Sequence, residues 1–152
     1  MESDFYVSVG QRTRFTKTVG ESDVYLFAGI TGDLSPNHVD QVYMERSRFG
    51  TRMAHGALLV GFMSTASTMA IAHTRGAPET PVSAGYDRIR FIAPVLLGDT
   101  ITVTYTIAAI DRERRRSTAD IEVANQRGEL VAVGRHILQW VPGGEPPAAP
   151  AT

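Results

Sequence analysis

Asp33 and His38 lie five positions apart in the run Gly-Asp-Leu-Ser-Pro-Asn-His, which begins at Gly32. A carboxylate and an imidazole that share one loop can act as an acid/base pair on water or on a substrate. Pro36 fixes its own φ and restricts Ser35 to extended conformations, so the loop should be stiff. We therefore take Asp33 and His38 as a candidate catalytic dyad.

A second histidine, His55, precedes Gly56 in a segment, residues 54–72, in which no residue carries a full formal charge. We expect a long buried helix here, wrapped by a sheet, because apolar residues surround its hydroxyl groups. A membrane span is the alternative, since the length approaches the roughly 20 residues that a bilayer needs. Four hydroxyls, two glycines and the terminal histidines disfavour insertion into a membrane.

Two shorter helices are expected on either side of the dyad loop. The first covers residues 23–30, with Glu21 or Ser22 as its cap and Gly32 at its end. The second begins after Asp40, whose carboxylate can accept a hydrogen bond from the first turn. The dyad loop is therefore expected to run from helix to helix.

The second half of the sequence is typical of β-strands joined by short turns, which favours an antiparallel sheet. Within residues 100–110, the apolar side chains of residues 101–107 alternate with threonines, as in a strand with one exposed face. A long helix followed by an antiparallel meander predicts an α+β fold, a single hotdog domain over residues 1–141. The Pro- and Ala-rich tail, residues 142–152, should be disordered. The expected strands are residues 11–18, 84–92, 100–110, 117–125 and 130–141.

Composition excludes several classes of protein. With 152 residues, 43% of them hydrophobic and 20% charged, the chain suits one globular domain. A net charge of −1 gives no electrostatic footprint for nucleic acid or an anionic membrane. There is no cysteine, which excludes disulfides and Cys-containing zinc sites. The first residues lack the basic start and apolar run of a secretion signal, so we expect the cytoplasm.

The order of the motifs resembles that of the MaoC-like, (R)-specific enoyl-CoA hydratase family. The similarity covers the dyad loop, residues 31–40, then Phe49-Gly50, then the Ala-His-Gly-Ala-Leu-Leu run, residues 54–59. It continues through residues 90–99, which end in a Gly-Asp pair that joins strands. The resemblance implies reversible syn addition of water to a trans-2-enoyl-CoA, without a metal or redox cofactor.

The same resemblance implies roles for individual residues. Asp33 is similar to the family's base, and His38 to the partner that holds the same water. Gly56 would offer its backbone N–H to the thioester oxygen, at a helix start where the dipole favours negative charge. Ser64, nine residues after His55, would support the site. A buried Asp33 beside His38 would give a bell-shaped pH profile.

Each of these residues also has a structural interpretation. Asp33 could be an ordinary loop residue and His38 a hydrogen-bonding one, while His55 could only cap the helix and Ser64 only bond back to a helix carbonyl. No pair of histidines has zinc-ligand spacing with a third ligand nearby. The ordered motifs favour the catalytic interpretation for the dyad.

Two positions of the loop depart from the family pattern. Ser35 replaces an asparagine and Asn37 an apolar residue, which bears on substrate choice or on the polarity of the site. Arg88 and Arg90, which should share a strand face with Tyr86, are candidates for binding the phosphates of coenzyme A. The arginines of residues 112–116 are a further candidate, with a solvated turn as the default.

Three function classes remain open from the sequence. A hydratase is the leading hypothesis, a hotdog acyl-CoA thioesterase is the enzymatic alternative, and a non-catalytic acyl-CoA-binding subunit is the third. A small hotdog domain exposes a sheet edge and cannot complete a pantetheine channel alone. We therefore expect a homodimer or a higher homo-oligomer.

Overall fold

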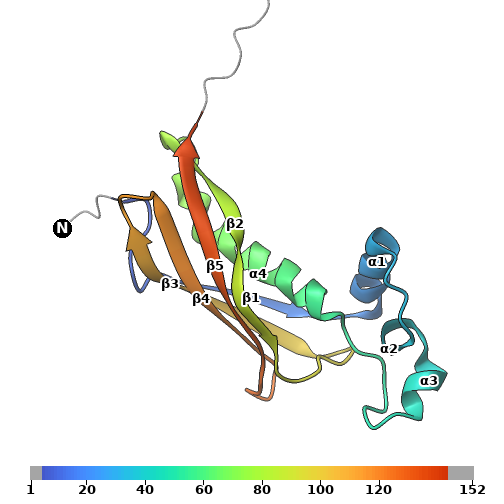
Figure 1. Ribbon diagram of the computed structural model, residues 1–152. Coiled ribbons are helices and arrows are strands. Elements are labelled where there is room, and N and C mark those ends of the chain that lie inside the picture. The colour runs from blue at the N-terminus through green and yellow to red at the C-terminus, as the bar shows by residue number, and fades with distance from the viewer. Residues whose placement is uncertain (1–4, 144–152) are drawn as a thin grey trace, which may run out of the picture.

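A five-stranded antiparallel sheet lies against one long helix in the computed structural model, which describes residues 5–143 (Figure 1). The strands are ordered β1-β3-β4-β5-β2 across the sheet, so β1 and β2 form its two edges. This is the expected hotdog arrangement. The strands are β1 (Arg12–Thr18), β2 (Glu79–Phe91), β3 (Thr100–Asp111), β4 (Arg116–Ala124) and β5 (Leu130–Pro142).

The alternating pattern of β3 sets which face of the sheet meets the core. Ile101, Val103, Tyr105 and Ile107 are buried, while the threonines between them lie on the other face and are partly exposed. The turn between β4 and β5 is closed by the Gly128 N–H, which donates to the Asn125 carbonyl at 3.0 Å. The predicted meander of β3, β4 and β5 is therefore confirmed.

The position of β2 differs from a simple meander. β2 pairs with β5 and not with β3, its successor in the sequence, so residues 92–99 cross from one side of the sheet to the other. It also begins at Glu79, five residues before the predicted start. Local alternation identifies a strand but carries no information on its partner, which is why the sequence did not show this crossing.

The pairing of β2 with β5 shifts at two places, between Ser83 and Gly85 and between Asp87 and Arg90, and the second shift bears on the site. Asp87 pairs with Arg135 and Arg90 with Val133, so three steps along β2 match two along β5. Within this bulge Arg88 has a φ of +55°, in the left-handed region that non-glycine residues rarely adopt. A bulge of one residue exchanges the two faces for every side chain that follows it.

The long helix α4 (Gly56–Ala70) packs on the sheet with one side only. Leu59, Met63 and Ala66 are buried against the sheet, whereas Gly61 and Ser64 are exposed. The expectation of a helix buried all round is therefore wrong for the single chain, because the sheet covers one side of the helix and leaves the other exposed. No helix among residues 5–143 is long and apolar enough to cross a membrane.

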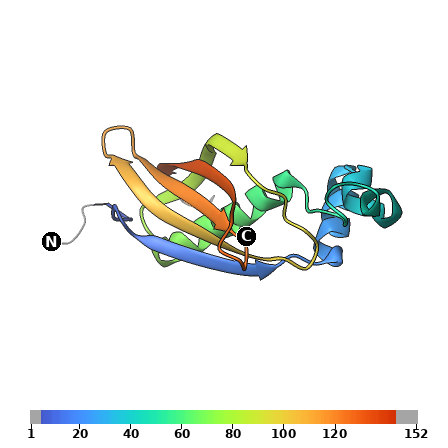
Figure 2. The ribbon, with the colours of Figure 1, turned by 90° about the horizontal axis from the view of Figure 1, so that it is seen from below.

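Three short helices gather beyond one end of the sheet, beside the start of α4 (Figure 2). They are α1 (Glu21–Thr31), α2 (Pro36–Val39) and α3 (Gln41–Glu45), and a 3-10 turn, η1 (Ala72–Thr74), follows α4. Gly20, rather than Glu21 or Ser22, is the N-cap of α1, and its N–H donates to Asp23 at 2.8 Å. Gly32 ends α1 with a φ of +79°, and the Asp40 carboxylate accepts from the Tyr43 N–H at 2.9 Å, both as predicted.

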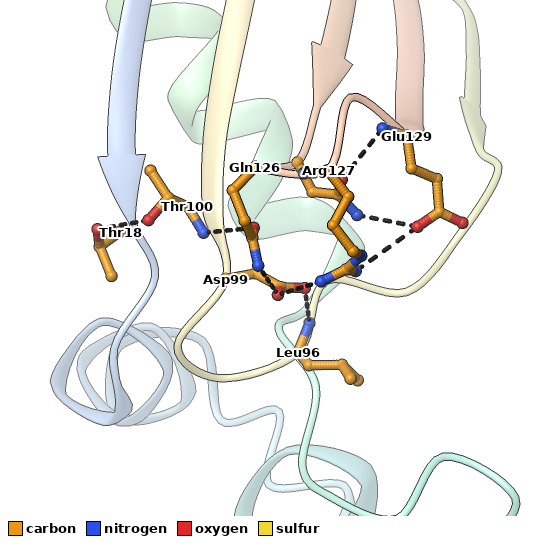
Figure 3. Close-up of polar contacts among 8 residues, drawn as sticks. Thr18, Leu96, Asp99, Thr100, Gln126, Arg127 and Glu129 are labelled. Carbon is orange, nitrogen blue, oxygen red and sulfur yellow. Dashed lines mark hydrogen bonds and ion pairs between the residues drawn. The ribbon is translucent and has the colours of Figure 1, made fainter.

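A buried carboxylate holds the crossing segment in place (Figure 3). Asp99, only 5% exposed, accepts from the Leu96 N–H at 3.0 Å and from the Gln126 amide at 2.8 Å. Arg127 forms an ion pair with it at 3.4 Å. Asp99 thereby ties residues 92–99 to the β4–β5 turn.

The end of β5 lies slightly beyond the predicted domain boundary. Pro142 is the last residue of the strand, and the Gly143 N–H donates to the Pro78 carbonyl at 2.9 Å. The first two residues of the predicted tail are therefore part of the fold. The rest of that tail, residues 144–152, lies outside the described residues, as do residues 1–4.

Candidate active site

The dyad loop is shaped by the residues that join α1 to α2. After Gly32 ends α1, the Asp33 N–H donates to the Thr31 hydroxyl at 3.2 Å. The Asp33 carboxylate accepts from the Ser35 N–H at 3.3 Å, and Ser35 is the N-cap of α2. The Asp33 side chain is exposed, so the expectation that it is buried is wrong, because α1 and α2 project beyond the sheet.

His38 is held in one tautomer by the main chain. Its Nδ1 lies 2.7 Å from the Met53 carbonyl oxygen, which can only accept a hydrogen bond. Nδ1 therefore carries the ring hydrogen, and Nε2 keeps a lone pair that can accept a hydrogen bond from water. The Met53 N–H also donates to the Asn37 carbonyl at 3.0 Å, which fixes α2 against this segment.

His55 contacts both members of the dyad. Its Nε2–H donates to the main-chain carbonyl of Asp33 at 2.9 Å, and its ring stacks on that of His38 with centroids 3.7 Å apart. The ring is 2% exposed, and its Nδ1 has no hydrogen-bond partner within the described part of the chain. His55 is also the N-cap of α4, so one side chain links the dyad loop to the helix start.

Three potential ligand atoms come together here. One atom each of Asp33, His38 and His55 lies within 4.8 Å of the others. The expectation that no third ligand lies near a histidine pair is therefore wrong, since the fold brings His55 to a loop 17 residues away. Zinc bonds of about 2.1 Å hold donor atoms roughly 3.4 Å apart in a tetrahedral site. Any two of these atoms that are as far apart as 4.8 Å would have to approach each other to share an ion.

A cavity of about 300 Å³ connects His38 to the start of α4. His38, Gly56, Leu59 and Phe91 line it together with the crossing segment, residues 92–95. Gly56 is the first residue of α4, and N–H groups at such a position have no carbonyl one turn earlier to bind. The cavity thus combines an imidazole acceptor, an apolar wall and a backbone donor.

Ser64 lies away from this cavity. It is exposed on α4, and it does not line the 300 Å³ cavity. Ser64 lies near the buried hydroxyl of Tyr86. Burial raises the pKa of Tyr86, and the nearby Ser64 hydroxyl offsets part of this increase. The two hydroxyls do not reach hydrogen-bond geometry. The predicted supporting role of Ser64 at the dyad therefore remains a proposal.

The two positions that depart from the family pattern act through the main chain. Ser35 caps α2 with its backbone, and its carbonyl accepts from the His38 N–H at 2.9 Å. Asn37 presents its carbonyl to Met53, while its side chain is exposed. Neither side chain contributes to the lining of the cavity.

The arginines proposed for coenzyme A do not share a face with Tyr86. The bulge places Arg88 in a shallow hollow with the exposed side chains of Asp120 and Glu122, on the outer surface of the sheet. Arg90 is exposed, and its guanidinium donates to the Ile89 carbonyl at 2.7 Å. The prediction of one shared face is wrong, because strict alternation fails at the bulge.

The arginines of residues 112–116 are partly engaged within the chain. Arg115 forms a close ion pair with Glu79, which lowers the pKa of that carboxyl group. Arg116 donates to the Gln139 amide oxygen at 2.7 Å.

Phe91 is the site residue that sequence reasoning missed. It lies in the segment of residues 90–99 and lines the cavity together with His38 and Gly56. The available signal was an aromatic residue beside the Pro94 connection, but its direction depends on the bulge at Arg88.

Comparison with known proteins identifies the family. The sequence model of the MaoC like domain matches residues 5–128, so the chain belongs to this family. An (R)-specific enoyl-CoA hydratase of Rhodospirillum rubrum is 38% identical over 109 residues, 72% of each chain. A 3-hydroxybutyryl-CoA dehydratase of Methylorubrum extorquens is 36% identical over 113 residues, which are 73% of this chain and 67% of the relative.

Solved structures agree with this assignment. The unliganded R-hydratase PhaJ1 of Pseudomonas aeruginosa superimposes with a TM-score of 0.77 at 28% identity, covering 96% of this chain and 94% of the other. The (R)-hydratase of Aeromonas caviae gives a TM-score of 0.77 over 91% of this chain and 98% of its own, at 24% identity, and supports the fold alone.

Proposed function

We propose that this protein is an (R)-specific enoyl-CoA hydratase, a hydro-lyase that interconverts trans-2-enoyl-CoA and (R)-3-hydroxyacyl-CoA. The observation that carries the proposal is the arrangement of Asp33, His38 and Gly56. His38, whose Nε2 keeps a lone pair, and Gly56, the first residue of α4, line the same cavity, and a carboxylate oxygen of Asp33 lies within 4.8 Å of a ring nitrogen of His38. The names of the related proteins point to the same reaction.

In the proposed reaction Asp33 and His38 hold one water molecule. The Asp33 carboxylate takes a proton from this water, while Nε2 of His38 accepts a hydrogen bond from its second hydrogen. The water oxygen then forms a bond to the β-carbon of the conjugated thioester. The electron pair of the carbon–carbon double bond moves toward the thioester oxygen and creates an enolate.

The enolate oxygen would be stabilised by the Gly56 N–H and by the positive end of the α4 dipole. Asp33 then returns its proton to the α-carbon on the face where the oxygen has added, which gives syn addition. Dehydration follows the same steps in reverse. The residues supply base, acid and oxyanion donor, so we propose that no metal or redox cofactor takes part.

The test is a panel of enoyl-CoA substrates, beginning with crotonyl-CoA. Hydration removes the conjugated double bond, so the expected result is a loss of its ultraviolet absorbance without release of a free thiol. Thiol release from a saturated acyl-CoA, detected with a thiol reagent, would instead indicate a thioesterase. A protein that binds acyl-CoA equally well before and after Asp33→Asn, with no turnover of any enoyl-CoA, would be a non-catalytic subunit.

We also propose that the protein acts as a homodimer. β2 is an open edge of the sheet, and the neighbouring face of α4 around Gly61 and Ser64 is exposed in the single chain. Open edges of this kind are commonly covered by another strand. Light scattering should give twice the mass of one chain, whereas a monomer at all concentrations would contradict the proposal.

A further inference from the structure

The bulge in β2 decides which way Phe91 points. Before the bulge Tyr86 faces the interior and stacks on His136, with ring centroids 4.3 Å apart. Strict alternation would then place Phe91, five positions later, on the outer surface. The extra residue at Arg88 reverses this, so that Phe91 faces α4. Arg88 lies within this bulge, and its left-handed φ is a strained backbone conformation that the surrounding strand pairing holds in place.

Phe91 lies directly on Gly56. A Cβ atom built on Gly56 would be 2.6 Å from Cε2 of the Phe91 ring and 2.8 Å from both Cδ2 and Cζ. Any side chain at position 56 would therefore displace the ring. Because the Phe91 ring takes up this space, a residue without a side chain is needed at position 56. This requirement is separate from any role of the Gly56 N–H.

The ring is a wall of the cavity rather than part of the core. Phe91 is 54% exposed, and it is absent from the residues that pack against the buried cluster of the sheet. It lines the same cavity as His38 and Gly56. Its size can therefore change the shape of the site without changing the packing that holds the fold together.

We propose that Phe91 is a specificity-determining residue that selects against a substituent on the α-carbon of the acyl group. The inference rests on the proposed hydratase function, in which Gly56 binds the thioester oxygen. The α-carbon is bonded to the carbon that bears this oxygen, so it lies beside the residue that Phe91 covers. An α-methyl group and the ring compete for this space, while a straight chain leaves through the rest of the cavity.

The experiment compares crotonyl-CoA with (E)-2-methylcrotonyl-CoA in the wild type, Phe91→Ala and Phe91→Leu. Rejection of one methyl group is typically worth a factor of roughly 10 to 200. Phe91→Ala should therefore raise the ratio of kcat/KM for the methylated over the straight substrate by about tenfold, and Phe91→Leu by less. Val82→Ala is the matched control, since Val82 is an exposed apolar residue of β2 that does not line this cavity.

A second readout does not depend on turnover. Calorimetry gives the dissociation constants of butanoyl-CoA and 2-methylbutanoyl-CoA. The ratio of the affinity for the methylated thioester to the affinity for the straight one should rise in Phe91→Ala and stay unchanged in Val82→Ala. If the wild type hydrates neither enoyl-CoA but the binding ratio shifts, the proposed reaction fails and the role of Phe91 stands. Unchanged ratios in both Phe91 variants, or no binding of either saturated thioester, overturn the inference.

Discussion

The imidazole rings of His38 and His55 lie face to face, with centroids 3.7 Å apart and planes inclined by 26°. Both rings donate one N–H to a main-chain carbonyl, that of Met53 for His38 and that of Asp33 for His55. The pair thus connects the dyad loop to Met53 by one hydrogen bond, and to His55, the residue before α4, by a second hydrogen bond and the stacking contact. The geometry of the dyad should depend on His55 even though His55 has no step of its own in the reaction.

Two replacements of His55 separate these contacts. His55→Phe keeps a flat ring against His38 but leaves the Asp33 carbonyl without its donor, whereas His55→Gln keeps an N–H donor and loses the ring. A neutral hydrogen bond contributes about 1 kcal/mol, so His55→Phe should lower kcat by roughly fivefold to tenfold with little change in KM. Retention of more activity by His55→Gln would assign the effect to the hydrogen bond. Unchanged kcat in both variants, with wild-type thermal unfolding, would show that His55 is only a helix cap.

The dyad variants should lose most of the activity. Asp33→Asn cannot accept the proton of water, and His38→Phe cannot hold that water, so each should lower kcat by about 10²- to 10⁴-fold. Asp33 is exposed and neither residue belongs to the buried cluster of the sheet, so both variants should remain folded in a thermal unfolding measurement. Asp40→Asn is the control, because Asp40 is a second carboxylate of the same segment that caps α3 and an asparagine can do the same. Wild-type rates in Asp33→Asn would remove Asp33 from the mechanism.

Asp99 should contribute to stability only while it is ionised. Burial alone would raise the pKa of Asp99, but the hydrogen bonds from Gln126 and Leu96 and the charge of Arg127 together hold it below the ordinary value. The contribution is therefore complete above the pKa of an unfolded aspartate and is lost as the pH falls toward the lower folded value. Asp99→Ala should lower the free energy of unfolding by about 1–3 kcal/mol at neutral pH, measured with urea. A smaller loss in Asp99→Asn at low pH than at neutral pH would confirm the role of the charge.

His136 should make the protein less stable in mild acid. Burial lowers the pKa of His136 from the ordinary 6.5 to about 4, and its two ring nitrogens bond to Ser83 at 2.8 Å and Tyr105 at 2.9 Å. The unfolded chain therefore binds a proton between these values and the folded chain does not. Stability from this group is complete above pH 6.5 and falls by about 3 kcal/mol as the pH drops to about 4.

Urea unfolding at about pH 7 and about pH 4.5 measures this loss. His136→Gln removes the titrating group while keeping polar atoms for Ser83 and Tyr105. The free energy of unfolding of this variant should be lower than that of the wild type at the higher pH. It should also change less than that of the wild type between the two pH values. An equal change in both proteins would mean that the acid sensitivity arises elsewhere.

Much of the fold could be predicted because the signals are local. The alternation of β3, the glycine that ends α1 and the Asp40 cap each depend on a few neighbouring residues. The dyad could be proposed for the same reason, since its two members share one loop. Family resemblance then supplied Gly56, which no local pattern connects to Asp33.

The remaining features depend on contacts between distant segments. The place of β2 at the far edge follows from pairing with β5, and the outward position of Arg88 and Arg90 follows from one extra residue in that pairing. The meeting of His55 with Asp33 and the cover of Phe91 over Gly56 arise only when α4 is in place. Composition and periodicity do not contain these relationships.

The most direct test of the central claim is the configuration of the product. Crotonyl-CoA is incubated with the wild-type protein and with Asp33→Asn, and the 3-hydroxybutanoyl-CoA formed is separated by chiral chromatography. The account predicts the (R) product alone from the wild type and about 10²-fold to 10⁴-fold less of it per unit time from the variant. An (S) or racemic product, or equal rates from both proteins, would contradict it.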